Sequence, residues 1–489
     1  MQGTTPRSSQ YGLFQPVDAA SLAICRIVFG SIMLAWSASL LLADQVSYYY
    51  IQPRFHFPYH GFDWVYPLPG IGMPLVFVAI SVLSVLILLG VRYRLAAVLF
   101  AALFAYVFLI DKATYQNHYY FVCLMSFLMA VVPANRAFSL DARLHRSAMP
   151  GLIPRWALWL IRFQVGVVYF YGGIAKLSND WIHGAPILEM LSSPSSRPFW
   201  GAFVGDEAAV QLIVWGGLLF DLLIVPALLW KRTRVIAFGL CLFFHLSNAL
   251  MFSIGIFPWL MIGVTTIFFE PDWPRRLLRI PAPNSRISDI VVPSRWWQQG
   301  VVTLLVLWCS VQVTVPLRHF FYAGDVNWTE RGHLFSWHMM LRGKRTAIRF
   351  HIQDPATGRT GIFPLEGTLK LHQVLRMSRD PVMIRDFARY IQSECHKHGF
   401  SNVQVRAFVL CSLNGRRPQL LVSPDRDLTS PALHADEDWV IPLTEPLRSV
   451  PWTAPLNRWE SLVMQDPLLG RDGLPSRSSN GPDQEGYSK

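Results

Sequence analysis

The chain of 489 residues has few charged residues for its length. Asp, Glu, Lys and Arg make up 15% of it, whereas about 25% is typical of soluble globular domains. Residues 1–317 hold 34 of the charged residues, and residues 318–489 hold the other 40. The first two thirds are therefore too apolar for a soluble fold. This imbalance predicts a membrane part followed by a water-soluble part.

The sequence also lacks the patterns of metal sites, secretion signals and repeats. Its six cysteines form no CxxC pair and no Cys/His zinc spacing, so we expect no metal site. Only Cys395 and Cys411 fall in the polar part, and the sequence leaves open whether they are bridged. The first apolar run starts at Ser21 without a small-residue cleavage pattern, which is typical of a retained span. No internal repeat is evident.

Nine apolar runs approach the roughly 20 residues that a helix needs to cross a bilayer. They are residues 21–43, 74–91, 95–110, 117–133, 156–174, 208–230, 235–252, 256–269 and 299–317. The segment 235–269 could be two crossings or one broken helix, because Ser253, Gly255 and Pro258 interrupt it. The sequence thus predicts a polytopic α-helical membrane protein with about nine spans, embedded in a lipid bilayer.

Basic residues are concentrated in alternate connections between these runs. The rich connections hold Arg92, Arg94, Arg136, Arg143, Arg146, Arg155, Lys231, Arg232, Arg234, Arg275, Arg276, Arg279, Arg286 and Arg295. The opposite loops hold only Arg54, Lys112, Lys176 and Arg197. By the positive-inside rule the rich connections are cytoplasmic, which favours two crossings for 235–269 and a C-terminal domain on the non-cytoplasmic side. The net charge of +12 is largely this topology signal, so we expect no nucleic-acid partner.

Four parts follow from these patterns: a cytoplasmic N-terminal segment (1–20), a transmembrane domain (21–317), an extracytoplasmic β-rich or α+β domain (318–451) and a disordered tail (452–489). The extracytoplasmic domain alternates like strands and contains one amphipathic helix that begins near a proline. The expected strands are 345–352, 361–365, 403–412 and 418–423, and the expected helix is 381–397. The tail is rich in Pro, Ser, Gly and Asp.

Two clusters of polar residues stand at the ends of spans, where charges are expensive and usually face an interior cavity. Residues 111–120, which include Asn117 and His118, open the fourth span, although such a sequence is also typical of an aromatic outer loop. At the end of the fifth span, Tyr169, Gly173 and Lys176 share one helical face. The alternative for this lysine is that its long side chain merely reaches the membrane surface.

A third cluster lies inside an otherwise apolar helix. His245 and Asn248 are three residues apart and face the same way. They could be hydrogen-bonding contacts between helices, with Asp221 of the preceding span as a partner. A metal site is disfavoured because no HxxxH motif or carboxylate pair accompanies them.

A set of motifs, each present once, follows in a fixed order over about residues 15–430. They are Asp111-Lys112, Asn117-His118, Tyr169-Phe170 through Gly173, Lys176-Leu177, Asp180-Trp181, Phe220-Asp221-Leu222, His245, Phe252-Ser253-Ile254-Gly255, Asn327-Trp328-Thr329, Ser336-Trp337, Met339-Met340, Arg349 and the turn Gly358 to Gly361. In this order and at these separations the sequence resembles the vitamin K-dependent γ-glutamyl carboxylases. It resembles equally the bacterial proteins grouped with them under the horizontally transferred transmembrane domain.

The resemblance implies a membrane carboxylase. In that family a membrane-embedded lysine deprotonates vitamin K hydroquinone, and oxygen addition then yields a base strong enough to remove a γ-proton from a peptide glutamate. The carbanion attacks carbon dioxide, which gives γ-carboxyglutamate and vitamin K epoxide. The resemblance implies that Lys176 is the base and that His118 assists it. The expected quinone-binding residues are Tyr169, Gly173, His245, Asn248, Asn117 and Asp221, and the quinone could be vitamin K or a related menaquinol.

The physical chemistry of a buried lysine agrees with this assignment. A lysine acts as a base only when it is neutral, and burial in a low dielectric disfavours the ammonium form. An apolar site also keeps water from quenching the reactive anions. The hydrophobic quinone would arrive from the bilayer, and the glutamate-containing peptide or protein would arrive from the outer aqueous side.

Two departures from the animal enzymes leave alternatives open. Ala175 stands where those enzymes have a second lysine, and only Arg197 could substitute for an arginine that they carry about one span-length later. The chain could therefore be a quinol epoxidase without glutamate carboxylation. From residue types alone, it could also be a non-enzymatic membrane binder or transporter of a lipid or solute, because interrupted helices such as 235–269 are used by transporters.

Overall fold

The computed structural model of the chain describes residues 12–144, 151–191, 207–251, 254–283, 294–400, 402–431 and 438–469. It divides into two compact units. The membrane unit comprises Met1–Asn327 and Arg331–Arg342, and the sheet unit comprises Trp328–Glu330 and Gly343–Lys489. The boundary expected at residue 318 therefore differs from the observed one, because residues 331–342 return to the membrane unit. Phe252, Ser253 and Arg197 of the sequence predictions lie outside the described residues.

Among the described residues, nine apolar helices occupy the nine predicted runs. They are α1 (Ala20–Leu42), α2 (Gly72–Leu89), α3 (Tyr93–Ile110), α4 (Asn117–Val131), α6 (Arg155–Ala175), α10 (Glu207–Leu229), α11 (Arg234–Met251), α12 (Phe257–Thr265) and α14 (Arg295–Leu317). Six of these are long and apolar enough to cross a membrane, whereas α4, α11 and α12 are shorter. The chain is thus a multi-pass membrane protein, and the number of nine crossings stays a prediction.

Short elements connect these helices. They are η2 (Gly12–Phe14), η3 (Ser47–Ile51), η4 (Lys112–Thr114), α5 (Leu140–Leu144), α7 (Asn179–Ile182), α8 (Ala185–Leu191), η6 (Thr266–Phe268), α13 (Trp273–Leu278), η8 (Arg318–Phe321) and α15 (Val326–Thr329). Strands β1 (Pro16–Asp18) and β2 (Leu152–Pro154) form a two-stranded antiparallel sheet in which Val17 pairs with Ile153.

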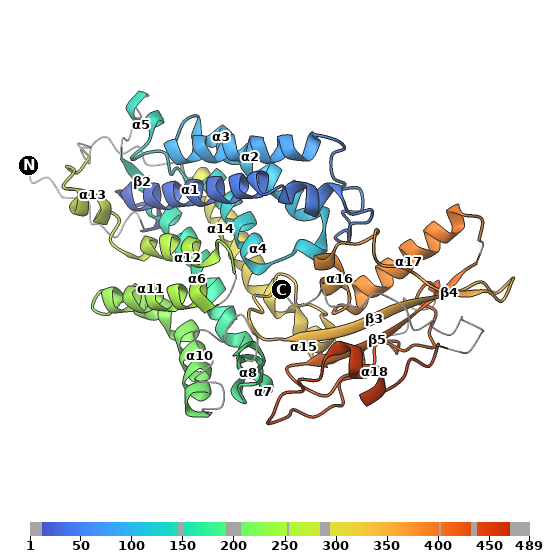
Figure 1. Cartoon of the computed structure of the whole chain (residues 1–489). Coiled ribbons are helices and arrows are strands. Elements are labelled where there is room, and N and C mark those ends of the chain that lie inside the picture. Colours follow the sequence, from blue (N-terminus) through green and yellow to red (C-terminus); the bar gives the residue numbers. More distant parts are fainter. Residues whose placement is uncertain are drawn as a thin grey trace, which may run out of the picture. The chain divides into compact units, whose positions relative to one another are not determined.

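The membrane helices pack in two connected groups. Helices α1, α2 and α3 lie side by side (Figure 1), and α4 packs against α3. Helix α6 packs against α10, which in turn contacts α11. A Cβ on Gly30 would lie only 2.7 Å from the backbone nitrogen of Leu88, so this glycine permits the close approach of α1 and α2.

A buried arginine holds one end of the first group of helices together. Arg26 of α1 is 0% exposed, and its guanidinium donates to four backbone carbonyls. The acceptors are Ile87 (2.6 Å), Leu88 (2.7 Å), Ala134 (3.1 Å) and Phe138 (2.6 Å). Carbonyls at a helix C-terminus lack intrahelical donors and carry partial negative charge. Two carbonyls in the last turn of α2 and two in the turn after α4 therefore compensate this charge.

The loop between α1 and α2 is fixed by buried polar contacts. The Asp111 carboxylate accepts from the backbone nitrogens of Phe57 (3.2 Å) and Ala113 (2.8 Å), and the Lys112 nitrogen donates to the Phe57 carbonyl at 2.8 Å. Asp111 is 0% exposed. It thus joins the loop to the end of α3.

His56 in this loop should make stability depend on pH. Burial lowers the pKa of His56 from 6.5 to about 4, against the opposing effect of hydrogen bonds with the backbone of Tyr49 and Tyr50. Between these pH values the unfolded chain binds a proton that the folded chain does not. Stability should therefore fall as the pH drops from 6.5 to 4, by up to about 3 kcal/mol.

Unfolding of wild type and His56→Gln, measured side by side between pH 7 and pH 4.5, checks this expectation. The substitution removes the titrating group, so its curve against pH should be flatter than that of wild type. Parallel curves would contradict the proposed contribution of His56.

The sheet unit is the predicted α+β domain. Its antiparallel sheet has the order β4 (Thr360–Ile362), β3 (Lys344–Gln353), β5 (Gln404–Leu413) and β6 (Gln419–Leu420), and in its register Ile348 pairs with Val409. Helix α17 (Pro381–Lys397) packs on β5 and follows α16 (Leu371–Met377). Asp380 caps α17 by accepting from the nitrogens of Val382 and Met383. Cys395 and Cys411 are both free.

The chain beyond residue 452 differs from the expected disordered tail. Residues 452–469 contain η10 (Leu456–Arg458) and α18 (Trp459–Leu462), and Trp459 is 0% exposed in a cluster with Phe408 and Leu410. Asp466 accepts from His351 at 2.8 Å. A few anchoring side chains therefore hold a segment whose composition resembles a tail. Residues 470–489 lie outside the described residues.

Candidate active site

An ion pair between two membrane helices forms the centre of the site. Lys176 follows the last residue of α6, and its Nζ lies 2.5 Å from Oδ2 of Asp221 on α10. The same Nζ donates to the Gly172 carbonyl at 3.3 Å. Lys176 is 5% exposed and Asp221 is 4% exposed. The pair is thus held away from water, as the sequence predicted for the lysine.

Two glycines bring α6 and α10 close enough for this contact. A Cβ on Gly173 would lie 2.6 Å from Leu222 Cδ2 and 3.2 Å from the Leu222 backbone nitrogen. A Cβ on Gly172 would lie 3.1 Å from Asp221 Oδ2 and equally close to Met339 Cε. Any larger side chain would push the helices apart. Gly173 therefore acts by permitting helix packing.

An aromatic ring completes the surroundings of the lysine. Lys176 Nζ lies 5.2 Å from the centre of the Trp181 ring, within the range of a cation–π interaction. The Trp181 indole nitrogen donates to the Val214 carbonyl at 3.1 Å, which fixes the ring against α10. The lysine tip is therefore enclosed by a carboxylate, a carbonyl and an aromatic face.

The carboxylate changes the chemistry expected of the lysine. The sequence predicted an amine kept neutral by burial, with Asp221 as a partner for His245 and Asn248. In the structure Asp221 pairs with Lys176, so it is the pair that has no net charge. Burying two opposite charges together avoids the full cost of burying either alone. The pair keeps the same proton count whether the shared proton is on nitrogen or on oxygen.

A second polar cluster lies about 10 Å farther along the same face of α6, by helix geometry. The Tyr169 hydroxyl and His245 Nε2 of α11 are 2.7 Å apart, and Thr265 Oγ1 lies 3.4 Å from the hydroxyl. Tyr169 and His245 are each 2% exposed. His245 Nδ1 is buried and has no hydrogen-bond partner among the described residues. Asn248 is half-buried on the same helix.

Aromatic rings join the two polar clusters. Phe220, which precedes Asp221, stacks on Phe244 with ring centroids 4.1 Å apart and meets the Tyr169 ring edge-on at 5.8 Å. The Phe257 ring lies 6.2 Å from each of the two imidazoles, His245 and His118. The structure therefore brings His118 of α4 and His245 of α11 to the same phenylalanine.

Asn117 has a different environment from its neighbour His118. Its side-chain oxygen accepts from the Tyr115 hydroxyl at 3.0 Å, and its side-chain nitrogen donates to the His338 carbonyl at 3.0 Å. Both ends of the amide are thus engaged within the protein. His118 is half-buried and packs on Tyr119 with a centroid distance of 4.4 Å.

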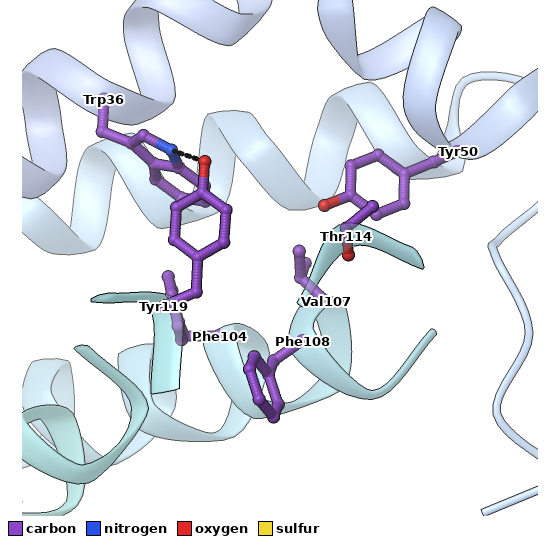
Figure 2. A pocket seen from close by; sticks show the side chains of 7 residues that line it. All are labelled: Trp36, Tyr50, Phe104, Val107, Phe108, Thr114 and Tyr119. Atoms are coloured by element: carbon purple, nitrogen blue, oxygen red, sulfur yellow. Dashed lines mark hydrogen bonds between the residues drawn. The ribbon is translucent and has the colours of Figure 1, made fainter. Parts of the chain in front are cut away.

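A small cavity lies beside Tyr119, between α1, α3 and α4 (Figure 2). It is lined by Trp36, Tyr50, Phe104, Val107, Phe108, Thr114 and Tyr119. The Trp36 indole nitrogen donates to the Tyr119 hydroxyl at 3.2 Å, as Figure 2 shows. The cavity has a volume of about 20 Å³, which is room for one water-sized molecule. Neither Lys176 nor Asp221 lines this cavity.

Sequence reasoning missed part of this site. Phe257 and Thr265 had no sequence signal, because an apolar or small residue in an apolar run is indistinguishable from ordinary helix packing. Met339 was singled out as part of a motif, but its contact with α6 joins residues far apart in the chain and has no local signal. The pairing of Lys176 with Asp221 was also missed, since they lie on different helices. Among the described residues, the structure contains no cluster of His, Cys, Asp and Glu that could hold a metal ion.

Comparisons with known proteins cover both units. The HTTM domain family matches residues 14–273, and the vitamin K-dependent gamma-carboxylase lumenal domain matches residues 297–446. The uncharacterized protein YitO of Bacillus subtilis is 28% identical over 125 residues, which cover 23% of this chain and 39% of YitO. The similarity thus spans well under two thirds of that relative. No solved structure matches this chain.

Proposed function

Because this chain belongs to the vitamin K-dependent γ-glutamyl carboxylase family and carries its HTTM domain, we propose that it is a membrane carboxylase. It couples oxygenation of vitamin K hydroquinone, or a related menaquinol, to conversion of a peptide glutamate to γ-carboxyglutamate. The observation that carries this proposal is the buried pair of Lys176 and Asp221. The quinol, with oxygen, supplies the strong base that removes the glutamate γ-proton, and carbon dioxide supplies the new carboxyl group.

The residues around the pair fit a flat, hydrophobic ligand with polar oxygens. Phe220, Phe244 and Phe257 provide aromatic surfaces on three different helices. His245 Nδ1 is buried without a hydrogen-bond partner among the described residues, and such a nitrogen suits a ligand oxygen. We therefore assign quinone binding to the region between Tyr169, His245 and His118, and proton removal to Lys176.

The pair of Lys176 and Asp221 would act as one base. When it accepts a proton, the nitrogen holds its full set of protons and the carboxyl oxygen holds one more. The pair then carries a single positive charge beside the anion left by the departing proton. In a site closed to water this charge stabilises the anion strongly. Asp221 thus stores and orients a proton, while Lys176 faces the reactant.

His118 and Asn117 have separate roles in this proposal. His118, which shares Phe257 with His245, is placed to contact the quinol and assist the same proton transfer. Asn117 uses both ends of its amide on the protein, so it positions the start of α4 and the segment around His338. Asn248 lies about one helical turn from His245 on α11, and it remains a proposed lining residue of the quinone-binding region.

The sidedness of the reaction follows from the basic residues. The loops that hold Lys112 and Lys176 carry few positive charges, which favours an outer position for the end of α6. The sheet unit follows α14 on that same side in the nine-span topology. A peptide glutamate would thus approach from the outer aqueous phase, and the quinone would approach through the bilayer.

One assay on the purified full chain tests the proposal. With reduced vitamin K, oxygen, labelled bicarbonate and a glutamate peptide, we expect both vitamin K epoxide and labelled peptide. The amount of labelled peptide should not exceed the amount of epoxide, because each quinone-derived base removes one glutamate proton. Both products should disappear when the quinone is supplied in its oxidised form.

The same assay distinguishes the second candidate, a quinol epoxidase without carboxylation. Ala175 favours it, because this small side chain packs against the buried cluster that contains Trp181 and adds no positive charge near the pair. Epoxide without labelled peptide would select this candidate. Absence of both products under all conditions would contradict the enzymatic proposal.

A further inference from the structure

The segment Arg331–Arg342, here called the strap, returns to the membrane unit after α14 and has an unusual backbone. Phe335, Trp337 and Met340 have φ values of 62°, 59° and 59°. Residues with side chains rarely adopt this left-handed conformation, because Cβ approaches the backbone too closely. Contacts elsewhere must hold the strap in place, and such over-determined strain gathers at clamps and switches.

Those contacts come from the start of α4 and from the end of α14. The Phe335 backbone nitrogen donates to the Tyr115 hydroxyl at 2.7 Å, and the Arg318 guanidinium donates to the Leu334 carbonyl. The Tyr120 ring packs on both Phe335 and Trp337, with centroid distances of 4.8 and 5.0 Å. One end of the strap is thus held by hydrogen bonds and by tilted ring contacts.

The other end of the strap lies against the ion pair. Met339 Cε lies 3.1 Å from the position that a Cβ on Gly172 would take, and Asp221 Oδ2 is equally close to that position. Leu341 is 2% exposed and belongs to the same cluster as Trp181, whose ring lies under Lys176 Nζ. The strap therefore runs from α4 across to the residues that enclose the lysine.

We propose that the strap is a lid on the aqueous route to the Lys176–Asp221 pair and that Met339 is the residue that closes it. The lid rests on the proposed function in one respect: a peptide glutamate must come from water to the quinone that reacts beside the pair, whereas the quinone itself comes from the bilayer. The Met339 side chain is a flexible, unbranched thioether, so it can move away from the pair without repacking the helices. The strained backbone lowers the cost of release relative to a relaxed segment. Opening the strap would admit the water-borne reactant, and closure would exclude water from the reactive anions.

Chemical access to the pair tests the lid without any turnover. The Cβ of a cysteine at position 217 would lie 3.9 Å from Lys176 Cε and 3.4 Å from Trp181 Cζ2, which are ordinary van der Waals contacts beside the pair. The matched control is a cysteine at the neighbouring Gly216, which has open space around its Cβ position. The full chain in liposomes is treated with a charged, membrane-impermeant methanethiosulfonate, and each modified peptide is identified by mass.

With the native strap we expect slow modification at position 217. Met339→Ala should raise this rate at least tenfold, whereas Met339→Leu, which preserves the volume, should leave it unchanged. Tyr115→Phe loosens the opposite end by removing the acceptor of the Phe335 N–H, and it should raise the rate in the same direction. The rate at position 216 should be the same in every background.

Equal rates of cysteine modification at position 217 in the native, Met339→Ala and Tyr115→Phe backgrounds would contradict the lid proposal. A rise at both cysteines in one variant would show general loosening of the helices and would also count against it. Because the labelling needs no quinone, oxygen or peptide, a chain inactive in the carboxylation assay could still show the lid, and an active one could lack it.

Discussion

Replacing Lys176 with alanine should lower the rate of epoxide formation by about 10²- to 10⁴-fold, the range that general-base catalysis usually supplies. The expectation follows from the position of Nζ, which is buried, paired with Asp221 and enclosed by Trp181. Lys176→Arg should be equally inactive, because a guanidinium stays protonated: it cannot pass a proton to Asp221 and then accept the proton of the quinol. Epoxide formed per minute at saturating quinol measures the effect.

Two controls separate lost chemistry from lost folding. Lys176→Ala leaves a buried carboxylate without its partner, so Lys176→Ala/Asp221→Asn removes that charge as well and should be folded yet inactive. Lys231 offers a matched comparison, since it also pairs with a carboxylate, Glu270 at 3.1 Å, but its side chain is 79% exposed. Lys231→Ala should keep wild-type turnover. Substantial epoxide formation by the folded double variant would remove Lys176 from the mechanism.

Removing Asp221 should destabilise the membrane unit by about 3–5 kcal/mol, because it strands a buried ammonium group. The variant Asp221→Ala tests this in thermal or denaturant unfolding of the detergent-solubilised chain. Replacing both partners, as in Lys176→Met/Asp221→Leu, should recover most of the loss, since two apolar side chains need no compensating charge.

The exposed pair again supplies the control. Lys231→Ala breaks only the exposed contact and leaves the second partner of Glu270, Arg234, in place; an exposed ion pair contributes about 0–1 kcal/mol. A loss from Asp221→Ala no larger than that from Lys231→Ala would contradict a buried, energetically coupled pair. Failure of the double variant to recover stability would point instead to a packing role for the two side chains.

Much of the fold could be predicted because its signals are local. Long apolar runs located the nine helices, and period-two alternation located the strands of the sheet unit. The helical repeat likewise placed Tyr169, Gly173 and Lys176 on one face, which the structure bears out as the face toward α10 and α11. Each of these predictions depends only on residues close together in the chain.

The rest of the site depends on contacts that no local pattern encodes. Lys176 and Asp221 meet because Gly173 lets two helices approach, and nothing in either helix alone specifies that partner. The strap has neither helical nor strand periodicity, so the sequence placed residues 331–342 in the outer domain. Trp459 similarly anchors a segment whose composition resembles a disordered tail.

The guanidinium of Arg26 bears on how such a molecule can move. Its hydrogen bonds join α1 to the end of α2 and to the turn after α4. These elements cannot separate at that end of the bundle without exposing an uncompensated cation to hydrocarbon. These contacts restrict the relative motion of α1, α2 and the turn after α4. They do not involve α6, α10 or α11, so movement near the Lys176–Asp221 pair is free of this restraint.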